Sequence, residues 1–131
     1  MEILAGRVLV RPADPDVTTA FYRDVLGLAV FREFSGGTVF FLGGGYLEVS
    51  AYASEPASDH GGVALWMQVR DLAATREELA ARGAVIDREP LREPWGLDEM
   101  WIRDPDGLRI GLVEVPAEHP ARRDPRTPAG S

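Results

Sequence analysis

The side chains best suited to chemistry alternate with apolar residues along four short segments of this chain. Arg7 offers a cation, Glu48 a carboxylate and Gln68 an amide. Because alternate residues of a strand share a face, these groups would lie together if the segments are strands. A face that mixes charges, amides and aromatic rings is typical of a ligand cavity, and a solvated outer sheet face is the alternative interpretation. The mixed set comprises Arg7, Leu9, Arg11, Tyr46, Glu48, Ser50, Tyr52, Ala64, Trp66, Gln68, Arg109, Gly111 and Val113.

The residues between these positions are apolar, which predicts a second sheet face buried beneath helices. Two segments have helical spacing. Asp14 can cap the first, with Pro15 at its first position, and Gly27 can end it. Asp71 can cap the second, which would run to Arg82. The apolar set comprises Val8, Val10, Leu47, Val49, Ala51, Leu65, Met67, Val69, Leu108, Ile110 and Leu112.

The two halves of the chain repeat one order of elements: a strand, a helix and three further strands. This repeat predicts an α+β fold of two βαβββ modules that form a curved mixed sheet around a cavity. The expected modules are residues 1–53 and 63–115, joined by a linker over 54–62 and followed by a disordered tail over 116–131. The expected strands cover residues 3–10, 29–34, 38–42, 46–52, 63–69, 84–87, 97–103 and 108–115, with a tight turn over 104–107 before the last.

Composition excludes several classes of function. The chain has 131 residues and no cysteine, which excludes disulfides, thiolate metal sites and cysteine nucleophiles and favours a cytoplasmic location. All 14 basic residues are arginine, so Schiff-base chemistry is excluded. The formal net charge of −7 argues against nucleic acid and membrane partners. It weakly favours a cationic ligand.

Two short signatures, FYRDVLGL at 21–28 and DPDGLRI at 104–110, carry a resemblance to a known family. In this order they make the chain resemble the vicinal oxygen chelate superfamily over residues 3–115. That superfamily includes glyoxalase I, extradiol dioxygenases, fosfomycin resistance enzymes and bleomycin resistance proteins. The resemblance implies the glyoxalase/bleomycin resistance fold and a homodimer in which modules of two chains can pair.

The resemblance also implies four metal-ligand positions, one on each of four strands. Aligned by the two signatures, these four positions are occupied here by Arg7, Glu48, Ala64 and Gly111, of which only Glu48 has a carboxylate. Arginine cannot bind a cation, and alanine and glycine have no ligand atoms, so we expect no metal and no other cofactor. Arg7 and Glu48 could instead form a bidentate ion pair at that place, or Arg7 could point to water.

Within the superfamily, the chain most resembles bleomycin resistance proteins, which bind a drug without chemistry. The resemblance rests on Pro94-Trp95-Gly96 leading to the 103–105 turn, on the Trp66 strand, and on residues 27–50. It implies that Trp66 and Trp95 line a groove for an aromatic ligand. The residues predicted to bind the ligand are Arg7, Phe34, Glu48, Trp66, Gln68, Trp95, Trp101 and Arg109.

The leading interpretation is therefore a metal-free protein that sequesters an aromatic antibiotic or natural product. The alternative is an enzyme of the glyoxalase or dioxygenase type, a lyase, isomerase or dioxygenase. It would be metal-dependent, or metal-free with Glu48 as general base and Arg7 as stabiliser. A structural relative without a ligand is a third interpretation. His60 and His119 lie in the expected linker and tail, and are expected to play no part in a metal site.

Overall fold

The computed structural model of the chain describes residues 1–55 and 60–120. Each half of the chain forms one βαβββ module, in the order that the sequence predicts. Module 1 contains β1 (Val8–Val10), α1 (Pro15–Ala20), η1 (Phe21–Val25), β2 (Val30–Phe34), β3 (Gly37–Leu42) and β4 (Gly45–Ser50). Module 2 contains β5 (Ala64–Gln68), α2 (Leu72–Ala81), β6 (Ile86–Arg92), β7 (Asp98–Arg103) and β8 (Arg109–Glu114).

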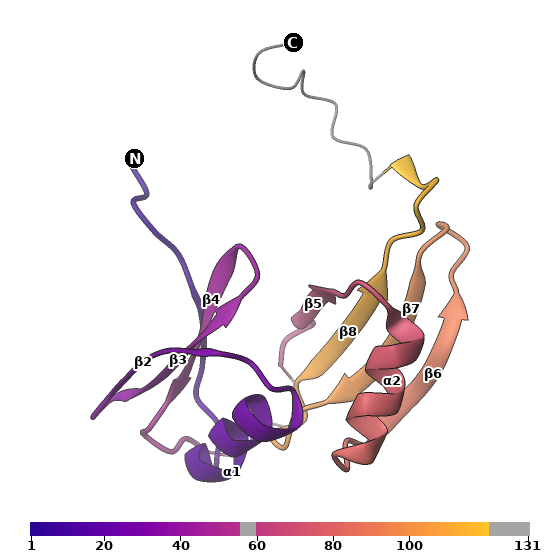
Figure 1. Cartoon of the computed structure of the whole chain (residues 1–131). Helices are drawn as coiled ribbons and strands as arrows, with labels where there is room; N and C mark the ends of the chain where they lie inside the picture. Colours follow the sequence, from indigo (N-terminus) through magenta and orange to yellow (C-terminus); the bar gives the residue numbers. More distant parts are fainter. Residues whose placement is uncertain (56–59, 121–131) are drawn as a thin grey trace.

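The strands form two separate four-stranded mixed sheets. The strand order is β1-β4-β3-β2 in the first sheet and β5-β8-β7-β6 in the second. The first strand of each module pairs in parallel with the last, and the other neighbours pair antiparallel. Figure 1 shows the modules side by side, with β5 on the side of module 2 that faces module 1. The predicted α+β class and the duplicated module are therefore confirmed, as two sheets that do not join into one.

The first helix begins as predicted but changes its winding halfway along. Asp14 caps it by accepting a hydrogen bond from the Val17 amide at 3.2 Å, and Pro15 occupies the first position. From Phe21 the chain continues as a π-helix, which ends before Gly27 at a φ of 69°. The wider turn buries the adjacent Phe21 and Tyr22 together. Periodicity alone does not reveal this change of winding.

Two strand predictions are wrong in their length. The first strand covers only Val8–Val10 rather than 3–10, and residues 1–7 are exposed. The sixth strand extends to Arg92, past Pro90, instead of ending at Asp87. Proline is tolerated there because β6 is an edge strand, and its pairing with β7 shifts between Arg88 and Leu91.

One hydrophobic core connects the helix-covered faces of both sheets. Leu47 and Val49 of the first sheet and Ile110 of the second are fully buried, as the alternation predicts. Val8 differs, because it lies on the short edge strand β1 and remains partly exposed. Within the part of the chain that is described, no helix is long and apolar enough to cross a membrane.

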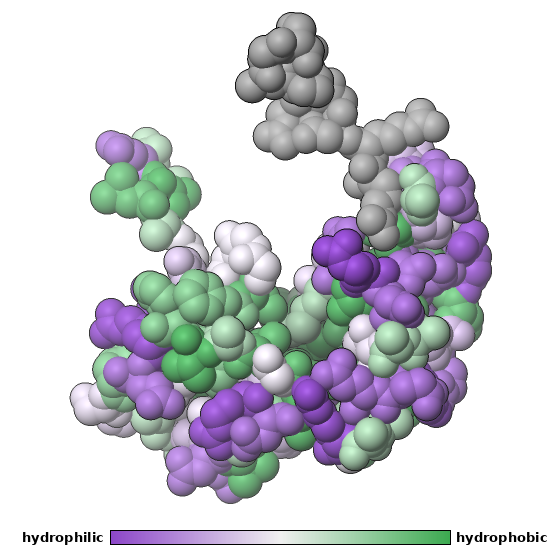
Figure 2. Space-filling view, in the orientation of Figure 1, coloured by the Kyte–Doolittle hydropathy of each residue, from purple (hydrophilic) through white to green (hydrophobic). Residues whose placement is uncertain are grey.

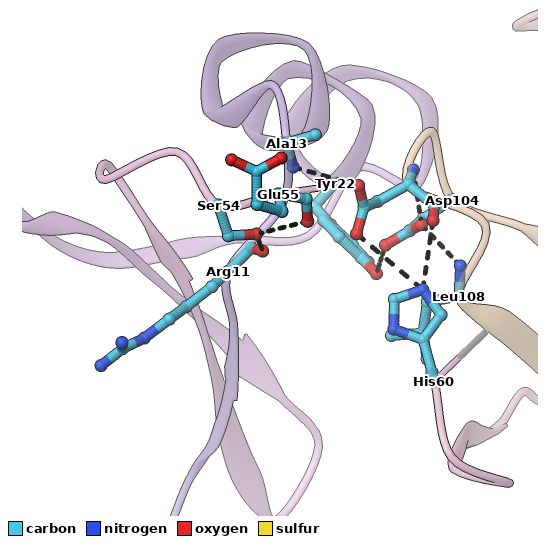
Figure 3. A network of polar contacts seen from close by, with 9 residues as sticks. Arg11, Ala13, Tyr22, Ser54, Glu55, His60, Asp104 and Leu108 are labelled. Atoms are coloured by element: carbon cyan, nitrogen blue, oxygen red, sulfur yellow. Dashed lines mark hydrogen bonds and ion pairs between the residues drawn. The ribbon is translucent and has the colours of Figure 1, made fainter. Parts of the chain in front are cut away.

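A polar network centred on the 104–107 turn joins the two modules (Figure 3). The Tyr22 hydroxyl of module 1 donates to the buried Asp104 carboxylate at 2.7 Å. The Ala13 amide donates to Asp106 Oδ1 at 3.0 Å. His60 Nε2 lies 3.1 Å from the carbonyl oxygen of Asp106. The two signatures that carry the family resemblance are thus in direct contact, and they fix the position of one module against the other.

The Tyr22 hydroxyl remains a donor because its surroundings oppose ionisation. Burial is the largest cause that raises the pKa of this phenol, and the negative charge of Asp104 is the second. The Asp104 carboxylate also accepts hydrogen bonds from the amides of Asp106 and Leu108, both at 2.9 Å. Three donors therefore satisfy one buried carboxylate at the junction of the modules.

Candidate functional site

Each sheet has a face that its own helix does not cover, and we call these the open faces. The open face of the first sheet carries Arg7 and Glu48, and that of the second carries Trp66, Trp101 and Arg109. The space-filling view shows a hollow between the modules, with apolar residues along its walls (Figure 2). Exposed aromatic rings on these faces distinguish them from an ordinary solvated surface.

The predicted contact between Arg7 and Glu48 is confirmed. Arg7 Nη1 donates to Glu48 Oε1 at 2.8 Å. Arg7 directly precedes β1, and the parallel register pairs Leu9 with Glu48, which brings the two side chains together on the open face. The contact is a single hydrogen bond rather than the predicted bidentate pair. It occupies the place where the resemblance implies the first two metal ligands.

The other two metal-ligand positions lie on the second sheet and offer no ligand atoms. Ala64 on β5 is paired with Arg109, and Gly111 on β8 lies between Trp66 and Trp101 in the sheet register. A Cβ placed on Gly111 would meet three ring atoms of Trp101 at 2.9–3.2 Å. The indole therefore lies over the position from which a ligand side chain would project, and the residues present do not fit a metal ion.

Residues 1–55 and 60–120 offer no other cluster of metal-binding side chains. No group of three or more histidine, cysteine, aspartate or glutamate side chains is arranged to hold an ion there. His60 lies at the turn that joins the modules, with its Nε2 3.8 Å from Asp106 Oδ2. His119 Nε2 lies 3.0 Å from the Trp95 carbonyl, so this part of the expected tail contacts the β6–β7 loop.

Three of the predicted ligand-binding residues line one cavity of about 580 Å³ on the open face of the second sheet. Trp95 comes from the β6–β7 loop, Trp101 from β7 and Arg109 from β8. The Arg109 guanidinium lies over the Trp101 ring, 4.5 Å from its centroid. Trp95 remains 58% exposed, so its side chain can contact a ligand. Trp95 thus forms one wall of the cavity and Trp101 forms its floor, with the Arg109 guanidinium stacked on the Trp101 ring.

Glu99 is a residue of this cavity that the sequence interpretation missed. It is 4% exposed, and its Oε2 accepts a hydrogen bond from Trp95 Nε1 at 2.6 Å. This bond holds the Trp95 indole in position even though the residue is in a loop. The alternation of a strand could have identified it, because Glu99 precedes Trp101 by two residues and therefore lies on the same face of β7.

The structure places Trp66 and Gln68 in a different cavity, of about 630 Å³. Its walls come from both modules: the end of η1 and the β3–β4 turn on one side, and β5 and α2 on the other. Leu26 and Leu79 contribute to it, and most of its lining is apolar. Seven of the eight predicted residues therefore divide between two cavities and the Arg7–Glu48 pair.

The open face of the first sheet carries an aromatic cluster of Phe31, Phe41 and Tyr46. Their ring centroids lie 4.9–5.8 Å apart. The sequence interpretation did not find this cluster, because the pairing of β2 with β3 shifts between Val30 and Arg32 and disturbs the simple alternation. Phe34, a predicted ligand contact, lies at the end of β2 beneath the guanidinium of Arg32, 4.8 Å from its ring centroid.

Comparisons with known proteins agree with this geometry. Residues 5–112 match the model of the Glyoxalase/Bleomycin resistance protein/Dioxygenase superfamily. No curated protein matches the chain. A protein of unknown function from Agrobacterium tumefaciens has a similar structure, with a TM-score of 0.70 and 22% identity over 88% of this chain and 95% of its own.

Two further solved structures have the same fold. A glyoxalase-related enzyme from Fulvimarina pelagi has a TM-score of 0.70 and 22% identity, over 89% of this chain and 91% of its own. A lactoylglutathione lyase from Agrobacterium tumefaciens has a TM-score of 0.62 and 24% identity, over 87% and 94%. At these identities the likeness concerns the fold, while the family match covers most of the chain. The chain belongs to the Glyoxalase/Bleomycin resistance protein/Dioxygenase superfamily.

Proposed function

We propose that this protein binds a planar aromatic small molecule without a metal ion and sequesters it, as a bleomycin-resistance-like binding protein would. The observation that carries the proposal is the Trp101 indole over Gly111. It fills the place of a metal ligand with an aromatic surface. The exposed Trp95 ring lines the same cavity of about 580 Å³, which is a suitable volume for a drug-sized ligand.

The enzymatic alternative has less support. One structural neighbour is named a lactoylglutathione lyase, but the four positions that would hold a metal here are arginine, glutamate, alanine and glycine. A metal-free reaction would use Glu48 as the base. Glu48 Oε1 already accepts a hydrogen bond from Arg7 Nη1 at 2.8 Å. The only candidate base of the metal-free reaction is therefore engaged with Arg7 before a substrate arrives.

Titration of tryptophan fluorescence tests the binding function. We expect at least one planar aromatic compound, from a panel of intercalating and glycopeptide antibiotics, to quench the emission saturably at micromolar concentrations. Trp101→Phe should retain binding because it keeps an aromatic ring over Gly111. A panel in which no compound changes the emission at up to about 1 mM, equivalent to a binding free energy of roughly −4 kcal/mol, would contradict the proposal.

We also propose that the protein is a homodimer in which module 1 of one chain faces module 2 of the other, with the ligand cavities left between the paired modules. Phe41 and Trp66 are 42% and 54% exposed, and such aromatic surface is typical of an interface. We expect sedimentation velocity to give a two-chain species at about 20 µM, and Phe41→Glu to shift it toward the monomer. Val85→Glu, at an exposed position in the turn before β6, is the matched control. A wild-type protein that sediments as a monomer would exclude the dimer.

A further inference from the structure

The cavity on the second sheet contains several charges, and all but one are already engaged with another group. Arg88 forms an ion pair with Glu93, and Arg103 forms one with Asp87. Glu99 accepts the Trp95 indole N–H, as described above. Within the part of the chain that is described, Arg109 has no carboxylate within ion-pair distance. The remaining group is a cation, in a protein whose net charge is −7.

The Trp101 ring supports the guanidinium of Arg109. The guanidinium lies 4.5 Å from the centroid of this ring, and the same ring covers Gly111. Stacking on an indole stabilises a guanidinium without using its N–H donors, so their edge stays available to a ligand. A planar, unpaired guanidinium matches the two oxygens of a carboxylate or the oxygens of a sulfonate or phosphate.

The other open face repeats this arrangement. The Arg32 guanidinium lies over the Phe34 ring at 4.8 Å, and, among residues 1–55 and 60–120, Arg32 forms no ion pair. An arginine supported by an aromatic ring and free of a carboxylate is therefore present on both faces. These two arginines favour an anionic ligand, whereas the net charge of −7 favours a cationic one.

We infer that the ligand of the cavity is an aromatic anion whose carboxylate, sulfonate or phosphate group binds the Arg109 guanidinium while its ring contacts Trp95. This inference rests on the proposed binding function and specifies the chemical class of its ligand. Trp101 is then a positioning residue for Arg109 as well as part of the cavity floor. Glu99 lies two residues before Trp101 on β7 and holds the Trp95 side chain in position by accepting its indole N–H.

Calorimetric titration with three probes of one shape tests this inference: 2-naphthoate, the neutral 2-naphthamide and the cationic 2-naphthamidine. We expect 2-naphthoate to bind about 10-fold more tightly than 2-naphthamide, the ratio typical of one hydrogen bond to a charged group. Arg109→Gln should reduce this ratio to about 1, because it removes the charged group that only 2-naphthoate pairs with. Arg92→Gln is the matched control: it removes the same charge outside this cavity, where Arg92 pairs with Asp98.

The outcomes separate this inference from the proposed function. Binding of 2-naphthamide or 2-naphthamidine as tight as that of 2-naphthoate overturns the anion assignment and leaves aromatic binding intact. An anion preference that survives Arg109→Gln overturns the role of Arg109. If none of the three probes binds and the antibiotic panel also fails, the proposed function is wrong, and the inference that rests on it is wrong as well.

Discussion

Replacing Trp101 by alanine is expected to weaken the binding of planar aromatic ligands by about 30-fold, the loss typical of a tryptophan at the centre of a binding site. The indole forms the floor of the cavity and supports the Arg109 guanidinium at 4.5 Å from its centroid. Its loss therefore removes an aromatic surface and releases the cation from its orientation. Fluorescence titration of the remaining tryptophans, or calorimetry with 2-naphthoate, measures the change.

Two further variants control for a general loss of structure. Trp101→Phe should recover most of the affinity, because it restores a ring over Gly111. Val85→Ala, at an exposed position that is not part of the cavity lining, should bind as the wild type does. If Trp101→Ala keeps wild-type affinity while its circular dichroism is unchanged, the cavity of Trp95, Trp101 and Arg109 is not the binding site.

Replacing Asp104 by alanine should lower the free energy of unfolding by about 3 kcal/mol, because three donors lose their common buried acceptor. Tyr22→Phe should cost about 2 kcal/mol, since it removes one of these bonds and leaves the carboxylate less satisfied. Urea denaturation of each variant gives these values, and a double-mutant cycle should show a coupling of about 1–2 kcal/mol between the two side chains.

Asp98→Ala provides the matched control for this second prediction. Asp98 forms an ion pair with Arg92 at the surface, and hydrogen bonding from Arg92 is the main reason that the pKa of Asp98 is lowered. Because such exposed pairs contribute little, its replacement should change the stability by less than about 1 kcal/mol. A loss of similar size in Asp98→Ala and Asp104→Ala would contradict the special role of the junction.

The fold was accessible from the sequence because local signals agree with one another. The cap at Asp14, the stop at Gly27 and the turn over 104–107 set the order of the elements. The alternation of apolar residues then identified the buried faces. Of the two arrangements left open for Arg7, a pair with Glu48 or exposure to water, the parallel pairing of β1 with β4 produces the pair.

The cavities were less accessible, because they depend on irregular features. The pairing shift in β2 determines where Phe31 points, and the passage of β6 through Pro90 determines where the Trp95 loop begins. The distance between the two sheets depends on the network around Asp104, which joins residues far apart in the sequence. Alternation alone therefore placed Trp66 on the open face, but it did not show that Trp66 and Trp101 line different cavities.

The central claim, aromatic binding that needs no metal, is tested most directly by one comparison of affinities. The protein is treated with EDTA and dialysed, and the best aromatic ligand from the panel is titrated calorimetrically before and after addition of Zn²⁺, Ni²⁺, Mn²⁺ or Fe²⁺. We expect the same dissociation constant, within about twofold, in every case. Binding that appears only after one of these ions is added, with one ion retained per chain, would contradict it.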